Sequence, residues 1–459
     1  MTTTPETRLL RHLLETPGSA IPGSALAATR RFAFDALAVG LAGTGHAAQP
    51  SLVTAAAKAG AGLEAGVWGD TMRLPAAQAA FVNAFQAHAL EFDAIHEAAV
   101  VHAMTPTLAA ALAEAERQAT AGEPVSGTRL LAALVLGLDL ACTIGAAARG
   151  PMRFFRPATA GMFGAFGAVA RLRGFDVSRG AAGAGLLLGQ IPGTMQAHHE
   201  GSVALAVQMG FAAAAAFRAA DLAEAGLTGP EHWLTGPSGF LPLTEPEHDL
   251  SPGLAALGAD WQVEHLSHKP FPSGRLTHPA IDGVQRLMAR CAIDPDAVRE
   301  IRLHLPPLAM RLVGRPQLPV LTPNYARLCL PYVVATTLRF GTVGLADFDA
   351  ARLSDPATLA LAARVLLLPD GNTDPNAVVP QSIEILPADG EALRITIEAT
   401  LGSPANPLSE PAQMAKAEAC GAAARHPIPP SRMHRLADLV AALPQAPDAA
   451  MLVEALRPD

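Results

Sequence analysis

Residues 83 to 107 gather polar and titratable side chains in a chain that otherwise has few. The segment NAFQAHALEFDAIHEAAVVHAMTPT holds His88, His96 and His102 together with Asp93, whereas charged residues make up only 16% of the sequence. Carboxylates and imidazoles are the side chains that most often transfer protons in enzymes. This segment therefore predicts a functional site rather than a solvated surface.

The position of each side chain in this segment follows from a predicted helix that covers residues 76 to 92. Asp93 falls at the helix exit, where a side chain can reach a cleft, and the following loop carries His96 and His102. Thr105, which precedes a proline, is predicted to cap the next helix, whose N-terminus attracts carboxylates. The alternative is structural: Asp93 caps a helix and the histidines are satisfied polar groups near an interface.

A metal site built from Asp93, His96 and His102 is conceivable. The spacing is not that of an HExxH motif, however, and nothing in the sequence specifies a fourth ligand. The four cysteines, at positions 142, 291, 329 and 420, are too scattered for a CxxC knuckle. The sequence therefore does not predict a metal site.

Cationic side chains gather in a second segment, HKPFPSGRLTHPAID, at residues 268 to 282. Lys269, Arg275 and His278 surround two prolines and a glycine, and cations on a rigid turn suit the binding of a carboxylate. The alternative is an ordinary exposed linker that leads into a helix. A third segment, TMQAHHEGS at residues 194 to 202, places His198 and His199 in an otherwise apolar region and is weak evidence when taken alone.

The elements that must position these residues are mainly helices. Apolar residues make up 50% of the chain and aromatic residues only 5%, a composition that favours closely packed helices. Apolar helical segments separated by Gly and Pro are expected at residues 26–42, 76–92, 106–119, 129–148, 161–173 and 203–225. Several are apolar nearly all round, so we expect them inside a multilayer bundle or at the interface of a homodimer.

The composition changes after Trp261, where proline, β-branched residues and runs of period two appear. Strands are expected at residues 300–305, 382–386 and 393–398, with a hairpin turn at Asp389-Gly390. The sequence predicts a mainly α protein: an all-helical domain of residues 1–264 and 403–459, and a smaller α+β lid domain of residues 265–402. The tail returns to helical composition at 414–424 and 433–443 and is expected to pack back on the bundle.

The overall charge and the termini limit the possible partners. The formal net charge is −8 and no basic run interleaved with aromatic residues occurs, so a nucleic-acid partner is not expected. The longest apolar stretch, at residues 130–148, includes Asp139 and is too short for an uninterrupted membrane span. The N-terminal residues lack the pattern of a secretory signal, so a cytoplasmic location is the expectation.

Six segments, in this order along nearly the whole chain, resemble the MmgE/PrpD family, which includes 2-methylcitrate dehydratase, cis-aconitate decarboxylase and iminodisuccinate epimerase. They are VWGD (67–70), AAFVNAFQAHALEFD (79–93), TAGMFGAFGAVARL (159–172), LTGPEHWLTGPSGF (227–240), KPFPSGRLTH (269–278) and LCLPYVVATTL (328–338). The resemblance implies a homodimer with a cleft between a helical domain and a lid domain. It also implies that a small anionic di- or tricarboxylate is processed there without a metal or organic cofactor.

The resemblance also implies roles for particular residues. Asp93, His102, Lys269 and Tyr332 match positions that look like the family's active-site residues. The residues expected to bind substrate are His96, Thr105, Arg156, Thr159, Gln196, His199, Ser273, Arg275 and His278. Arg156 and Gln196 stand where the family usually has a histidine and a lysine. An arginine can still bind a carboxylate but cannot serve as a base near neutral pH, and a glutamine lacks the positive charge of a lysine.

The sequence leaves three functions open. The leading hypothesis is a cofactor-independent lyase of the 2-methylcitrate dehydratase type, in which cations stabilise the charge that develops on a carboxylate while Asp93 or His102 exchanges a proton. The runner-up is an epimerase or isomerase acting on a related carboxylate. A protein that only binds a carboxylate or a partner, without catalysis, is the third hypothesis.

Overall fold

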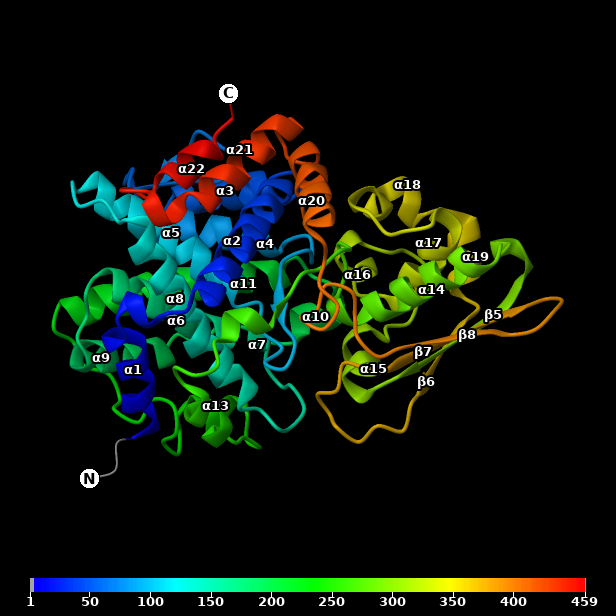
Figure 1. The fold of residues 1–459 in the computed structure, drawn as a ribbon, viewed down its shortest axis with the longest axis horizontal. Helices are drawn as coiled ribbons and strands as arrows, with labels where there is room; N and C mark the ends of the chain where they lie inside the picture. The colour runs from blue at the N-terminus through cyan, green and yellow to red at the C-terminus, as the bar shows by residue number, and fades with distance from the viewer. Residues whose placement is uncertain (1–3, 459) are drawn as a thin grey trace.

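The computed structural model describes residues 4–458 and confirms a mainly helical protein with a smaller sheet-containing part (Figure 1). The helical part is drawn from blue to green in Figure 1, and the sheet lies at the other end of the molecule. The α-helices of the first part are α1 (Pro5–Glu15), α2 (Gly23–Gly43), α3 (Gln49–Ala57), α4 (Ala76–His88), α5 (Met104–Thr120), α6 (Gly127–Ala146), α7 (Arg156–Thr159), α8 (Gly161–Leu172), α9 (Val177–Leu188), α10 (Gln196–Glu200), α11 (Ala204–Glu224), α12 (Phe240–Thr244) and α13 (Ser251–Ala256).

The core of the helical part consists of α4, α5, α6, α8 and α11, which pack against one another. Small residues let these helices approach closely. A Cβ atom placed on Gly164 of α8 would lie 3.0 Å from the carbonyl oxygen of Gly137 on α6 and 2.6 Å from the hydroxyl oxygen of Thr107 on α5. A larger side chain at this position would therefore push three core helices apart.

The second part contains a four-stranded sheet covered on one face by helices. Its strand order is β6-β5-β7-β8, with β5 parallel to β6 and antiparallel to β7, and β7 antiparallel to β8. Helix α14 packs on β7 and β8. The elements are β5 (Val298–Leu305), β6 (Val365–Pro369), β7 (Gln381–Pro387), β8 (Leu393–Ile397), α14 (His278–Arg290), α15 (Pro307–Val313), α16 (Pro323–Ala326), α17 (Leu330–Phe340), α18 (Ala350–Leu353) and α19 (Pro356–Ala362).

The period-two pattern of β5 buries every second side chain, as expected. On β5, the side chains of Ile301, Leu303 and Leu305 are buried, whereas the intervening Arg302 and His304 are partly exposed. The expected turn joins β7 to β8, and Gly390 within it has a φ of 107°, in the region that favours glycine. Strand β6 was not expected from the sequence, because its short apolar run does not alternate.

The C-terminal helices return to the helical part, as expected. They are α20 (Glu410–Ala422), α21 (Pro430–Ala441) and α22 (Met451–Ala455), drawn in orange and red in Figure 1. Helices α20 and α21 both pack on α2. This packing supports our proposal that residues 1–264 and 403–459 form one domain and residues 265–402 the other.

Two helices, α6 and α11, are long and apolar enough to cross a membrane by length and composition. Most of each helix is buried inside the fold. Core helices pass the same test, so these two are weak evidence for a membrane span, and the expectation of no membrane partner stays a prediction.

Candidate active site

The chain turns sharply just before Asp93. The sequence predicted a helix that continues to residue 92, but α4 ends at His88. Glu91 then adopts a φ of 51°, in the left-handed region that few residues other than glycine adopt. Backbone in such a region costs about 1–3 kcal/mol and persists only where the surroundings impose it.

Three buried cations from distant parts of the chain impose this turn. The consecutive carbonyl oxygens of residues 90 to 92 each accept a hydrogen bond from a different cation. Arg327 donates to the first at 3.3 Å, Lys269 to the second at 3.2 Å, and Lys416 to the third at 2.8 Å. Because a buried carbonyl without a partner is costly, these contacts explain why the helix can stop here. We call residues 90–92 the cation-held turn.

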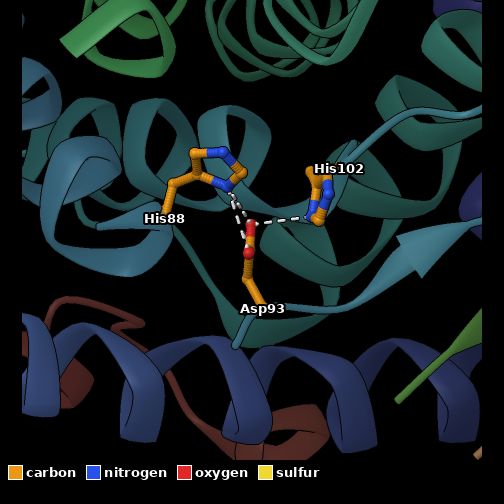
Figure 2. Close-up of side chains that lie close together, drawn as sticks. All are labelled: His88, Asp93 and His102. Atoms are coloured by element: carbon orange, nitrogen blue, oxygen red, sulfur yellow. Dashed lines mark hydrogen bonds and ion pairs between the residues drawn. The ribbon is translucent and has the colours of Figure 1, made fainter. Parts of the chain in front are cut away.

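The carboxylate of Asp93 lies between two imidazoles (Figure 2). Nδ1 of His88 is 3.0 and 3.1 Å from the two carboxylate oxygens, and Nδ1 of His102 is 3.1 Å from Oδ2. The hydroxyl of Thr105 donates to Oδ2 at 2.5 Å. Thr105 lies inside the first turn of α5 rather than at its N-cap, so the capping prediction was wrong and the side chain serves Asp93 instead.

Burial and neighbouring charges shift the pKa values of Asp93, His88 and His102 in different directions. Burial raises the pKa of Asp93, but the positive charges that His102 and His88 carry when they are protonated, as they are at the acid pH where a carboxylate titrates, outweigh it and hold this pKa well below its usual value. For His88, burial lowers the pKa while Asp93 and Glu91 raise it, and the net shift is upward. For His102, burial is the larger effect and outweighs the raising effect of Asp93, so the pKa is lowered. The arrangement therefore favours an ionised Asp93, a protonated His88 and a neutral His102.

The two nitrogens of His102 have different surroundings. Nδ1 lies 3.1 Å from the Asp93 carboxylate, outside hydrogen-bond geometry, and this proximity to a negative charge favours the tautomer that places the proton on Nδ1 and leaves the lone pair on Nε2. His102 lines a cavity, whereas Asp93 is completely buried behind it. His102 is thus the residue of this pair that a bound molecule can contact, and Asp93 is the residue that orients it.

The cavity next to His102 lies where the helical part meets the sheet-containing part. It is small, about 70 Å³, and its lining comes from the loop after α4, from α10 and from residues 274–276, 308–313 and 328. Its polar lining residues are Glu91, Glu97, His102, His198 and Arg275. A cavity of this size holds only a few water molecules, so a di- or tricarboxylate needs side chains to move apart before it can enter.

Two buried cations at this boundary each face a carboxylate. Nζ of Lys269 lies 2.9 Å from Glu91, and the guanidinium of Arg275 lies 2.7 Å from Glu97. Lys269 holds the pKa of Glu91 at about 2 against the effect of burial. The short strands β3 (Ile95–His96) and β4 (Leu266–Ser267) pair antiparallel and bring these charges together across the boundary.

Other residues predicted to bind substrate are buried nearby and have partners in the protein. Ser273 shares a hydrogen bond with the hydroxyl of Thr277 at 2.8 Å. His278 contacts the backbone oxygen of Ser273, and burial together with Arg275 holds its pKa well below the usual value. The His96 ring accepts from the backbone of Ala99, and burial lowers its pKa to about 4. Thr159 is buried in α7, and its hydroxyl lacks a hydrogen-bond partner among the described residues.

Only His102 and Arg275 of the thirteen predicted site residues line this cavity. Four of the others are exposed or have partners that do not belong to the Asp93 network. Gln196 and His199 are exposed on α10. The hydroxyl of Tyr332 donates to the backbone oxygen of Asp347 at 2.5 Å. Arg156 makes a bidentate contact with a buried carboxylate, that of Glu245, at 2.8 and 3.1 Å. In this structure Arg156 is thus neutralised within the helical part rather than free to bind a substrate.

Three residues that lie at the site were not among the predicted catalytic or substrate-binding residues: His88, Glu91 and His198. His88 and Glu91 lie in the segment that the sequence singled out, but a helix continued to residue 92 would have pointed them away from Asp93. His198 lines the cavity, whereas its neighbour His199 does not. Burial lowers the pKa of His198 to about 3, so this ring is neutral near pH 7. The paired histidines were the signal, and the sequence could not show which of them is buried.

A metal ion is the alternative occupant of this group. Candidate ligand atoms of His88, Asp93 and His102 lie within 4.8 Å of one another, whereas His96, named in the sequence-based alternative, is not part of the group. Both oxygens of the Asp93 carboxylate already contact Nδ1 of His88, and Oδ2 also accepts a hydrogen bond from Thr105. The described contacts thus fit a hydrogen-bonded network better than a metal centre.

Two known proteins are similar to this chain over about three quarters of its length. The chain is 28% identical over 376 residues to the "cis-aconitate decarboxylase-like protein oryM" of Aspergillus oryzae, an alignment that covers 77% of each chain. It is 25% identical over 361 residues to the cis-aconitate decarboxylase of Homo sapiens, covering 75% of this chain and 72% of the human protein.

Two family models together cover most of the sequence. The MmgE/PrpD N-terminal domain matches residues 7–252, and the MmgE/PrpD C-terminal domain matches residues 271–443. The first contains the Asp93 network and the second contains Arg275 and the sheet. The chain therefore belongs to the MmgE/PrpD family.

Proposed function

We propose that this protein is a lyase that acts on a small carboxylate, with His102 as the group that removes a proton next to the carboxylate. The observation that carries the proposal is the placement of His102: it lines the cavity, and its Nδ1 faces the buried Asp93. A neutral imidazole held in one tautomer by a carboxylate is a general base suited to neutral pH.

In the proposed elimination, Nε2 of His102 takes the proton from the carbon next to the substrate carboxylate. The electron pair of that C–H bond forms the carbon–carbon double bond, and the C–O bond of the neighbouring hydroxyl breaks. The imidazolium then gives its proton to the departing hydroxyl, which leaves as water, and His102 returns to its neutral form. Because one residue performs both transfers, the proton and the hydroxyl leave from the same face of the substrate.

Negative charge develops on the substrate carboxylate during this step, so a nearby cation must stabilise it. Arg275 lines the cavity and has five donors, some of which point at backbone oxygens and at Glu97. Asp93 does not take the proton itself. It stabilises the imidazolium that forms on His102, with Thr105 and His88 fixing its position.

Decarboxylation is the second candidate. Two relatives that are 25–28% identical to this chain are named cis-aconitate decarboxylase or cis-aconitate decarboxylase-like. The mostly apolar lining of the cavity also favours loss of a carboxylate, because the charge of that group is concentrated in the substrate and spread out in the transition state.

Proton NMR in deuterated water distinguishes these reactions on a panel of di- and tricarboxylates. New vinyl signals with loss of water indicate a hydro-lyase, and carbon dioxide release indicates a decarboxylase. Deuterium exchange without either indicates an epimerase. The variant His102→Gln is expected to lower the rate on the order of 10²–10⁴-fold.

The matched control is His199→Gln, the same change at an exposed histidine outside the cavity. This control is expected to react within twofold of the wild-type rate. If His102→Gln reacts as fast as the wild type, His102 is not the base. If the wild-type protein binds members of the panel but leaves all of them unchanged, the protein is a carboxylate-binding paralogue.

A further inference from the structure

We propose that the substrate is a dicarboxylate or monocarboxylate with a hydrocarbon arm, rather than a tricarboxylate. This inference rests on the proposed function, because it concerns the molecule that His102 would deprotonate. It follows from the composition of the cavity and from how many nearby cations are free to receive a carboxylate.

The lining of the cavity is mostly hydrocarbon. Ile95 and Val100 come from the loop after α4, Phe155 from the segment before α7, and Leu308, Leu312 and Val313 from α15. A carboxylate that contacts these side chains would give up its hydration without receiving hydrogen bonds in return. A hydrocarbon arm would gain free energy in the same position.

The charged side chains at the cavity point to the same conclusion. Lys269 and Arg275 are paired with Glu91 and Glu97, and these two glutamates themselves line the cavity. A substrate carboxylate that binds to Lys269 or Arg275 must therefore either displace a glutamate from its partner or lie close to a like charge. A substrate with three carboxylates would meet this cost several times over.

Arg315 lies outside the cavity lining but next to it, and it is a second cation, besides Arg275, that a carboxylate can reach. Its side chain is buried, and it donates to the backbone oxygen of His198, which lines the cavity. Its Nη1 is buried without a hydrogen-bond partner, and within residues 4–458 no carboxylate forms an ion pair with it. An unpaired guanidinium nitrogen beside an apolar cavity suits a substrate with a single anchoring carboxylate and an apolar remainder.

The test is a series of 2-alkyl-substituted malates with hydrogen, methyl, propyl, butyl and hexyl arms, measured beside citrate, 2-methylcitrate and cis-aconitate. The readout is kcat/KM from proton NMR. Among the malates, kcat/KM is expected to rise about fourfold for each methylene that becomes buried, the factor that corresponds to ~0.8 kcal/mol. The best alkylmalate is expected to exceed each tricarboxylate at least tenfold.

Two variants test whether the arm lies in this cavity. Leu312→Ala widens the apolar lining and is expected to raise the ratio of kcat/KM for the hexyl over the propyl compound at least fourfold. Leu287→Ala, at a buried position on α14 outside the cavity lining, is the matched control and should leave that ratio unchanged. Arg315→Met is expected to lower kcat/KM about tenfold for every arm length while preserving the dependence on arm length.

The outcomes separate the inference from the proposed function. If the tricarboxylates react fastest and arm length has no effect, the inference is wrong while the lyase function stands. If Leu312→Ala and Leu287→Ala change the ratio equally, the arm does not lie in this cavity and the inference is likewise overturned. If neither the malates nor the tricarboxylates exchange deuterium or give product, the proposed function itself fails.

Discussion

Removal of Lys416 is expected to destabilise the protein and to disturb Asp93, the residue that orients His102, although Lys416 does not contact it. Nζ of Lys416 lies 2.6 Å from Asp35 and donates to the carbonyl oxygen of Phe92, the residue before Asp93, at 2.8 Å. Both members of the Lys416–Asp35 pair are almost completely buried. Lys416 thus joins helix α20, far along the chain, to the cation-held turn.

The expected magnitude follows from the burial of the pair. Lys416→Met leaves Asp35 as an unpaired buried charge, which costs about 3–5 kcal/mol in the free energy of unfolding. In the double variant Lys416→Met/Asp35→Asn the stranded charge is gone, so the cost should fall to about 1–3 kcal/mol. The two substitutions are therefore expected to be strongly non-additive, with a coupling of about 2 kcal/mol or more.

Urea denaturation followed by tryptophan fluorescence measures these differences, and Lys58→Met provides the control at an exposed lysine. The control is expected to change stability by no more than about 0.5 kcal/mol. At temperatures where all variants are folded, Lys416→Met should also lower kcat about ten- to a hundredfold, because a shift of the turn misplaces Asp93. A loss below 1 kcal/mol with unchanged kcat would refute the view that Lys416 holds this turn.

Three further predictions concern residues whose roles the structure clarifies. Thr105→Val removes the hydroxyl that donates to Asp93 at 2.5 Å, and we expect kcat to fall about tenfold with stability changed by less than about 2 kcal/mol. Gln196→Ala should leave kcat/KM within twofold, because Gln196 is exposed and its amide contacts Glu200; a larger loss would restore its predicted role in substrate binding. Arg156→Met leaves the buried Glu245 without its partner and should lower the free energy of unfolding by about 3–5 kcal/mol. The double variant Arg156→Met/Glu245→Met should recover most of this loss, and thermal unfolding of both variants measures it.

The helices of the core could be predicted from the sequence, because their apolar pattern is long and their ends carry Gly and Pro. The predicted range 161–173 corresponds to α8 at Gly161–Leu172, and the range 203–225 to α11 at Ala204–Glu224. In such segments local composition and tertiary burial favour the same structure. The sheet was predicted less completely, since β6 lacks alternation.

The end of α4 could not be predicted, because its cause lies elsewhere in the chain. Residues 89–92 are compatible with a helix by composition, yet Lys269, Arg327 and Lys416 bind the carbonyl oxygens of residues 90–92 in a different conformation. Local propensity cannot reveal partners that lie 178 to 324 residues away. For this reason the sequence pointed to Asp93 and His102 but not to the roles of His88 and Glu91.

The predicted binding residues show a related limit. The sequence indicates that Arg156 is a cation, but only the structure shows that Glu245, 89 residues later, neutralises it. Residue type could also not distinguish the buried His198 from the exposed His199. The kind of chemistry was thus predictable from the residue types, whereas the availability of each group depends on long-range partners.

The central claim, that His102 acts as a neutral base oriented by Asp93, is tested most directly by the pH dependence of kcat/KM for wild type and Asp93→Asn. Because burial lowers the pKa of His102, wild-type kcat/KM should rise with pH through a midpoint below 6.5 and then stay level to pH 8. The charge of Asp93 raises that pKa, so Asp93→Asn should move the midpoint to lower pH while reducing the plateau on the order of 10²–10⁴-fold. A wild-type kcat/KM that instead falls between pH 6 and 8 would mean that the protonated imidazole is the active form, and it would contradict this account.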